Sequence, residues 1–256
     1  PDYVGWKLTA QDYENIPNLK AILPASTATQ WIDGEVAKSK NIPICDIRNF
    51  SSEAVAEWAV MAALNLARRI PELTKDGFPL DYDKDYMKYR GIELKGKTAG
   101  VIGLGNIGSV IAERCQGLGM NVVYWNRSPK ENNYQLKDIA EIFKSADVIF
   151  PALATSDETK QLLDKKLVDT LKPSAIVVTI AGHLIDANLL AEKVANGKLF
   201  GFGFEGKPKE FSKYEGNVWA APSYAWATDQ TMHNSMVKWI DNMIDAVNGK
   251  FPNRVN

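Results

Sequence analysis

The chain has 256 residues, of which 45% are hydrophobic and 24% charged, a composition typical of a globular protein and not of a disordered or fibrous one. Lysine and arginine total 30 against 31 acidic residues, a balance that gives no reason to expect a nucleic-acid or membrane-surface partner. No apolar run reaches the length of about 18 residues that a membrane span needs, and Cys45 and Cys115 are too few for a disulfide framework, so we expect a reducing, cytoplasmic compartment.

The first part of the chain contains short candidate strands and one long helix. Tyr3–Trp6 resembles an internal strand with no initiator methionine or signal peptide before it, so we expect the natural protein to begin further upstream. Asn18–Leu23 and Ile42–Ile44 are predicted strands. Ser52–Leu73 is a predicted helix whose apolar residues lie nearly all round, which indicates burial. The polar and aromatic stretch Asp81–Tyr86 is predicted to connect two lobes.

After residue 97 the pattern changes to short apolar strands that alternate with helices. Ile107–Leu118 and Asp186–Asn196 show helical spacing of apolar residues, and the second has an acidic N-cap and a glycine just beyond its end. Such alternation predicts βαβ units and a doubly wound parallel sheet that is buried on both faces. The predicted strands are Thr98–Ile102, Asn121–Trp125, Asp147–Phe150, Ala175–Ile180, Leu199–Phe204 and Val218–Ala220.

The last predicted helix begins near Thr228 and ends before Gly249. One stripe of apolar side chains runs along it at helical spacing, and we expect this stripe to pack into a core. The stripe consists of Met232, Met236, Trp239, Met243 and Val247.

The strongest motif is the glycine pattern G-x-G-x-x-G in residues 103–108, which follows a predicted strand and opens a predicted helix. In this context Gly103 is expected to form a tight turn, Gly105 to admit a pyrophosphate against bare backbone, and Gly108 to let the helix approach the strand. The helix N-terminus then offers backbone N–H groups and a positive dipole end to the phosphates. The motif predicts a dinucleotide site.

The end of the second strand of this unit decides which dinucleotide is preferred. A carboxylate about 20 residues past the motif is the usual partner of the NAD ribose, but Asn126 and Arg127 stand here instead. Asn126 is neutral and Arg127 offers a forked donor to a 2′-phosphate, so we favour NADP over NAD; an ordinary surface charge is the alternative interpretation of Arg127. The residues expected to contact the dinucleotide are Gly103, Gly105, Asn106, Ile107, Gly108, Asn126, Arg127 and Ser128.

Together with the glycine motif, several segments resemble the D-2-hydroxyacid dehydrogenase family, and within it the glycerate dehydrogenase or hydroxypyruvate reductase branch. The resemblance covers essentially the whole chain. The segments that carry it are 49–57, 93–98, 119–122, 145–149, 157–159, 222–228 and 253–256.

This resemblance implies an α/β fold of two lobes. Residues 89–227 would form a Rossmann-type dinucleotide-binding domain. Residues 1–88 and 228–256 would form a smaller flavodoxin-like substrate lobe, which lacks its first β-α unit. The family also implies a homodimer that forms through the nucleotide lobe.

In the family an arginine holds the substrate carboxylate, a histidine moves the proton and a glutamate tunes that histidine. Ala181 stands at the arginine position and offers no donor to a carboxylate. Ser223 stands at the histidine position, and its hydroxyl has no pKa near neutrality. Counting without a gap from Glu205, where the family has aspartate, places Glu210 at the glutamate position, with a solvated loop carboxylate as the alternative.

The remaining candidates for proton transfer are His183, which lies one residue past Gly182, and Tyr224. A loop histidine without a catalytic role is the alternative for His183. No cluster with metal-ligand spacing occurs, so no metal is expected. The sequence thus predicts an NADP-dependent reductase with a non-standard substrate or altered acid–base residues. The competing hypothesis is a catalytically silent dinucleotide-binding paralogue that acts as a regulatory or structural partner.

Overall fold

The computed structural model describes residues 7–78, 81–154, 158–160, 162–180, 184–206 and 214–256. The strand expected at Tyr3–Trp6 lies outside these residues. The chain divides into two compact units, one formed by Pro1–Ser51 with Ala227–Asn256 and the other by Ser52–Trp226.

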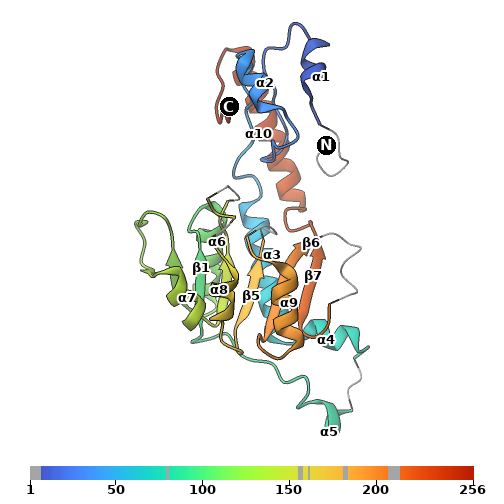
Figure 1. The fold of residues 1–256 in the computed structure, drawn as a ribbon, viewed down its shortest axis with the longest axis vertical. Coiled ribbons are helices and arrows are strands. Elements are labelled where there is room, and N and C mark those ends of the chain that lie inside the picture. Colours follow the sequence, from blue (N-terminus) through green and yellow to red (C-terminus); the bar gives the residue numbers. More distant parts are fainter. Residues whose placement is uncertain (1–6, 79–80, 155–157, 161, 181–183, 207–213) are drawn as a thin grey trace. The chain divides into compact units, whose positions relative to one another are not determined.

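The larger unit is built on one parallel sheet of strand order β3-β2-β1-β4-β5-β6-β7 (Figure 1). The expected parallel sheet is therefore confirmed, with a short additional strand, β3, at one edge. The strands are β1 (Thr98–Ile102), β2 (Asn121–Trp125), β3 (Gln135–Leu136), β4 (Val148–Pro151), β5 (Ile176–Thr179), β6 (Gly201–Gly206) and β7 (Val218–Pro222).

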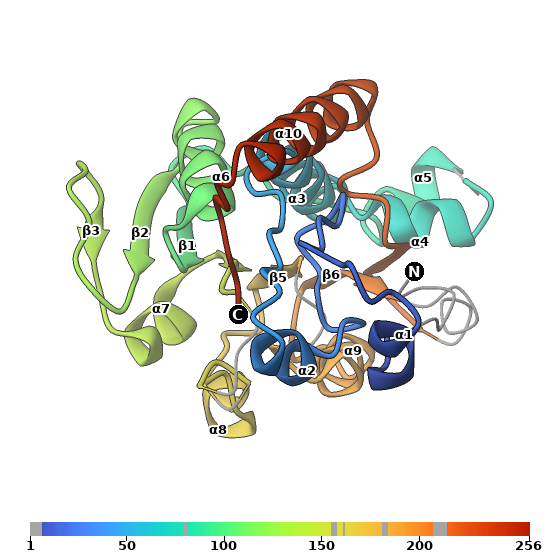
Figure 2. The same ribbon diagram turned by 90° about the horizontal axis from the view of Figure 1, so that it is seen from above.

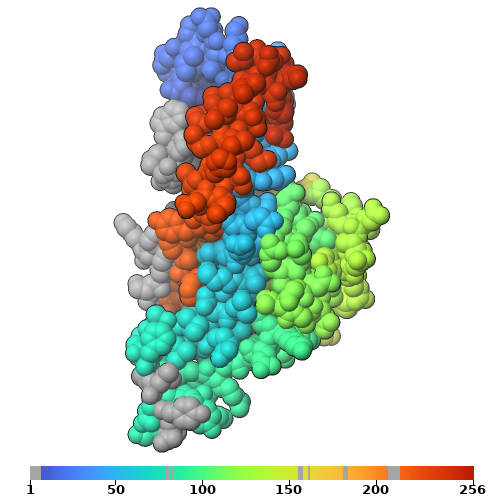
Figure 3. Space-filling view, turned by 180° about the vertical axis from the view of Figure 1, so that it is seen from behind, coloured from blue at the N-terminus to red at the C-terminus, as the bar shows by residue number. Residues whose placement is uncertain are grey.

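Helices cover both faces of this sheet. Figure 2 shows α3 (Ser52–Ala67) and α6 (Asn106–Gly117) on one face, and α7 (Ile139–Ser145), α8 (Lys165–Asp169) and α9 (Ala187–Ala195) on the other. Figure 3 shows the first face, where α3 lies beside α6. Each face has its own apolar core, which explains the continuous apolar runs of the strands.

Successive residues of a strand belong to the two cores in alternation, because neighbouring side chains of a strand point to opposite faces of the sheet. In β1, Val101 packs with the α3 and α6 residues, whereas Ile102 packs with the residues of α7 and α9. Both side chains are fully buried.

The segment expected to form one helix from Ser52 to Leu73 forms two. Helix α3 is followed by Arg69 in the left-handed conformation (φ 54°), and α4 (Ile70–Lys75) begins directly after it with proline in its first turn. Burial of α3 is confirmed for most of its apolar residues, but Met61 and Leu64 are exposed.

Helix α3 packs closely on the sheet of the larger unit. A Cβ added at Gly201 or Gly203 of β6 would lie 3.2 Å from the Leu66 side chain, so the two glycines admit the helix. Asn217 Nδ2 donates to the Leu66 carbonyl at 2.9 Å. Residues 52–88 belong to the same compact unit as the sheet, and the first segment of the other unit ends at Ser51. Helix α5 (Tyr82–Asp85) consequently lies within one unit and does not connect two lobes.

The smaller unit contains α1 (Ala10–Glu14), α2 (Gly34–Ser39) and α10 (Asp229–Val247). Parallel bridges join Leu8 to Ile32 and Ile22 to Ile44, so the strands expected at 18–23 and 42–44 are reduced to a single bridge. No described helix is both long and apolar enough to cross a bilayer.

The expectation that the apolar stripe of α10 packs into a core is wrong for Met232, Met236 and Val247, which are exposed. The face that contacts the rest of this unit is more polar. Trp239 Nε1 donates to the Leu23 carbonyl at 2.6 Å, and Asn242 Nδ2 donates to the Asp46 carbonyl at 2.9 Å. These bonds to backbone carbonyls select the face of the helix that is buried.

Asp147 ties the amino ends of neighbouring strands together. Its carboxylate accepts hydrogen bonds from the backbone N–H of Thr98 at 2.7 Å and from Lys172 Nζ at 2.8 Å. Burial alone would raise the pKa of Asp147, but the bonds from Lys172 and Thr98 outweigh it and hold the pKa below its ordinary value of 3.8.

We expect Asp147→Asn to lower the free energy of unfolding at pH 7 by about 1–3 kcal/mol, because charge-assisted hydrogen bonds are lost. The folded pKa is depressed, so this contribution is present above the ordinary value of 3.8 and is lost as the pH falls below it. Denaturant unfolding at several pH values measures the difference in the free energy of unfolding between the wild type and Asp147→Asn, and this difference should become smaller in acid. Asp81→Asn is the control, since Asp81 forms an ion pair with Lys84 in which both side chains are exposed. Equal losses in both variants, or a gap that does not change with pH, would contradict the assignment.

Candidate functional site

The glycine loop lies between the carboxyl end of β1 and the start of α6. Gly103 has φ +99°, in the left-handed region, and its N–H donates to the Trp125 carbonyl at 2.8 Å. A Cβ on Gly108 would come within 1.9 Å of the Gly103 carbonyl oxygen, so only glycine lets α6 pack against the loop.

Gly105 differs from its two neighbours in the motif because nothing lies within 4 Å of an added Cβ there. Its backbone (φ −85°, ψ −160°) is one that any residue adopts, so no local strain requires glycine at this position. Gly105 is also the N-cap of α6 and supplies no side-chain cap. A bare backbone that borders open space at a helix N-terminus fits a pyrophosphate.

The loop after β2 approaches the glycine loop. Asn126 Oδ1 accepts the N–H of Leu104 at 3.2 Å, and Asn126 Nδ2 donates to the Ser128 carbonyl at 2.9 Å. Arg127 forms an ion pair with Glu158, and both side chains are 72% exposed. The structure thus brings the expected dinucleotide contacts together: the motif residues Gly103, Gly105, Asn106, Ile107 and Gly108 lie at the end of β1, and Asn126, Arg127 and Ser128 follow β2.

Of Ser223, His183 and Glu210, which were expected to act in catalysis, Ser223 is described, whereas His183 and Glu210 lie outside the described residues, as does Ala181 at the arginine position. Ser223 follows β7 and is exposed, and its carbonyl accepts Trp226 Nε1 at 3.1 Å. Tyr224, the other candidate for proton transfer, is 66% exposed.

Glu205 served in the sequence only as a reference point for Glu210, yet the structure gives it a distinct environment. It lies near the end of β6, half-buried, and its Oε1 accepts the N–H of Ala225 at 2.7 Å. Burial raises the pKa of Glu205, and the backbone bonds from Ala225 and Tyr224 oppose that rise. A carboxyl group that gains a raised pKa at the carboxyl edge of the sheet can hold a proton closer to neutral pH. Its acidic character at a strand end was the available signal.

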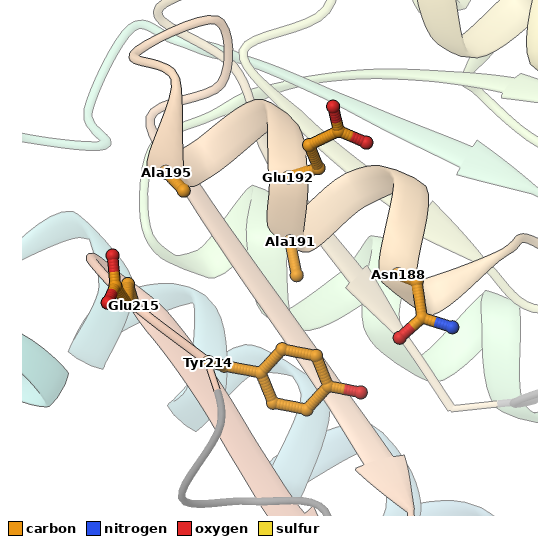
Figure 4. A pocket seen from close by; sticks show the side chains of 6 residues that line it. All are labelled: Asn188, Ala191, Glu192, Ala195, Tyr214 and Glu215. Atoms are coloured by element: carbon orange, nitrogen blue, oxygen red, sulfur yellow. The ribbon is translucent and has the colours of Figure 1, made fainter.

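Two pockets lie away from the glycine loop. The first, of ≈ 340 Å³, is between α9 and the segment before β7, with the Tyr214 ring opposite Ala191 (Figure 4). The second, of ≈ 490 Å³, lies between α8 and α9. Neither of the two is lined by a residue of the glycine motif or by Ser223.

Within the described part of the chain, no group of three or more His, Cys, Asp and Glu side chains is arranged to hold a metal ion. Cys45 and Cys115 are free and buried, and burial raises the pKa of the Cys115 thiol to about 12. This thiol is therefore not a nucleophile at neutral pH.

Comparison with known proteins finds similarity to dehydrogenases and reductases along most of the chain. The family model of the D-isomer specific 2-hydroxyacid dehydrogenase NAD binding domain matches residues 60–227. The glycerate dehydrogenase of Methylorubrum extorquens is 29% identical over 97% of this chain and 82% of its own length. The glyoxylate reductase of Thermococcus litoralis is 30% identical over 98% and 81%.

Among solved structures, an acyclic imino acid reductase in complex with NADPH and D-Arg is similar, with a TM-score of 0.84 and 26% identity. The match covers 98% of this chain and 83% of that one.

We expect Gly105→Ala and Gly108→Ala to differ in what they damage. Gly105→Ala should leave the free energy of unfolding within about 1 kcal/mol of the wild type, because its Cβ meets open space, but weaken NADPH binding at least about tenfold. Gly108→Ala should lower the free energy of unfolding by about 1–3 kcal/mol or more, because of overlap with Gly103. Thermal unfolding and NADPH fluorescence titration measure the two effects. Unchanged NADPH binding in a folded Gly105→Ala protein would exclude the loop as the pyrophosphate site.

Proposed function

Because the chain belongs to the D-isomer specific 2-hydroxyacid dehydrogenase family and therefore binds a nicotinamide dinucleotide, we propose that it is an NADP-preferring reductase of a small carbonyl compound. The observation that carries this proposal is the loop between β1 and α6, where bare backbone at Gly105 borders open space.

The glycine loop and the first turn of α6 would hold the pyrophosphate, through the backbone and the positive end of the helix dipole. Asn126 accepts a hydrogen bond from Leu104 and so ties the loop after β2 to the glycine loop; the neighbouring Arg127 would then contact the adenosine end. The bound dihydronicotinamide supplies a hydride, and the protein must then position the substrate and deliver one proton.

Preference for NADP rests on charge at the adenosine end. Asn126 is neutral and does not repel a 2′-phosphate, whereas a carboxylate at this place would. Arg127 offers two parallel N–H donors to a phosphate and is held only by an exposed ion pair. Both features support the phosphorylated dinucleotide.

The substrate half supports a substrate other than a standard 2-oxo acid. Ala181 cannot clamp a carboxylate, and Ser223 cannot by itself donate a proton near neutral pH. Glu205 is the described titratable group bonded to the loop that contains Ser223, and its raised pKa suits it to hold the proton that a reduced carbonyl oxygen takes up.

A second candidate substrate is an imine, and the serine at position 223 favours it. A protonated C=N group already carries its proton, so hydride addition gives an amine without a general acid. The similar imino acid reductase structure, which holds NADPH and D-Arg, supports this candidate.

We expect the wild-type chain to oxidise NADPH faster than NADH with aldehydes or with mixtures of 2-oxo acid and amine, and only slowly with hydroxypyruvate or glyoxylate alone. Absorbance at the dihydronicotinamide band follows the reaction. A rate that rises with added amine would select the imine, and a rate independent of amine the carbonyl. NADPH that binds but is never oxidised across the panel would contradict the reductase proposal.

Restoring the family residues should restore the family reaction. Loss of a general acid costs about a hundredfold to ten-thousandfold, so we expect Ala181→Arg combined with Ser223→His to raise turnover of hydroxypyruvate or glyoxylate at least about tenfold. Ser223→His alone is the control, because it restores the proton donor without the arginine that would hold the substrate carboxylate. No gain in a folded double variant would show that the two positions do not account for the altered substrate site.

A further inference from the structure

Arg127 and Glu158 form an ion pair between the segments that follow β2 and β4. Arg127 stands two residues after β2 and Glu158 seven residues after β4, and these two strands flank β1 in the sheet. The ion pair therefore joins the loops on either side of the strand that leads into the glycine motif. It lies at the carboxyl edge of the parallel sheet, where ligands of such folds bind.

This ion pair is weak and easily exchanged. Both side chains are 72% exposed, so water screens their attraction. An exposed pair of this kind changes an equilibrium constant by less than about fivefold. A phosphate monoester carries about two negative charges near neutral pH and presents three acceptor oxygens to a guanidinium. It can therefore displace a carboxylate from Arg127.

The neighbouring polar side chain is already engaged. Asn126 accepts from Leu104 through Oδ1 and donates to the Ser128 carbonyl through Nδ2, so both ends of its amide hold the loop. Of these two residues after β2, Arg127 is the one whose described partner is an exposed carboxylate, which a more highly charged anion can replace.

We propose that Glu158 sets the preference between the two dinucleotides by competing with the 2′-phosphate for Arg127. This proposal rests on the proposed NADP preference, and it adds Glu158 as a residue that reduces that preference. When a 2′-phosphate binds Arg127, the Glu158 carboxylate loses its partner. When the ribose carries only a hydroxyl, the ion pair persists. Glu158 thus lowers affinity for NADPH and leaves that for NADH nearly unchanged.

The test measures the Kd of NADPH and of NADH by fluorescence titration for the wild type, Arg127→Ala, Glu158→Gln and the double variant. Arg127→Ala should weaken NADPH about tenfold or more. Glu158→Gln should tighten NADPH about threefold to fivefold, and this gain should shrink at high salt because the groups are exposed. The double variant should match Arg127→Ala alone, and the Kd of NADH should change less than about twofold throughout.

Glu113→Gln is the control, since Glu113 is 67% exposed, forms an ion pair with Arg114 and lies two turns along α6 from the loop. It makes the same charge change and should leave both Kd values unaltered.

The outcomes separate the two proposals. If Arg127→Ala weakens NADPH and NADH equally, the NADP preference itself is wrong. If Arg127→Ala acts on NADPH alone but Glu158→Gln does not tighten it, the preference stands and the role of Glu158 is overturned. Weaker NADH binding in Glu158→Gln would also overturn it, because Glu158 would then be a ligand of the ribose.

Discussion

The close approach of α6 to the end of β1 is the constraint on which the rest of the site depends. A single methyl group at Gly108 would overlap the Gly103 carbonyl, so the helix can start where it does only because no side chain is present. That approach brings the helix N-terminus to the carboxyl edge of the sheet. It also leaves Gly105 facing open space, where the helix dipole and the bare backbone together suit an anion.

The two edges of the sheet have different tasks. At the amino edge, Asp147 ties β1 and β4 to Lys172 with a carboxylate whose pKa is held low. At the carboxyl edge, the polar groups serve the loops: Asn126 fixes one loop, and Glu205 accepts from another with a raised pKa. Hydrogen bonds at the amino edge hold strands together, whereas those at the carboxyl edge hold loops, and in folds of this kind the loops carry the site.

The order of residues along the chain was enough to predict those strands and helices that depend on neighbouring residues. The strands around the glycine motif and α6 follow directly from short apolar runs and glycine spacing. The prediction that the apolar stripe of α10 is buried was wrong because periodicity identifies apolar residues and not the face of the helix that contacts its neighbours. Trp239 and Asn242 mark that face through hydrogen bonds to backbone carbonyls far away in the sequence. The pairing of Arg127 with Glu158 joins residues 31 positions apart, and no local pattern contains it. The expectation that Ala181 and Ser223 replace catalytic residues comes from the family resemblance alone.

The most direct test of this account is a calorimetric titration of the unaltered chain with NADPH and, separately, with NADH. We expect saturable binding of both dinucleotides at one site per chain, with the phosphorylated form bound more tightly. Absence of any binding heat with either dinucleotide, across temperatures that rule out a cancelled enthalpy, would contradict the assignment of the glycine loop.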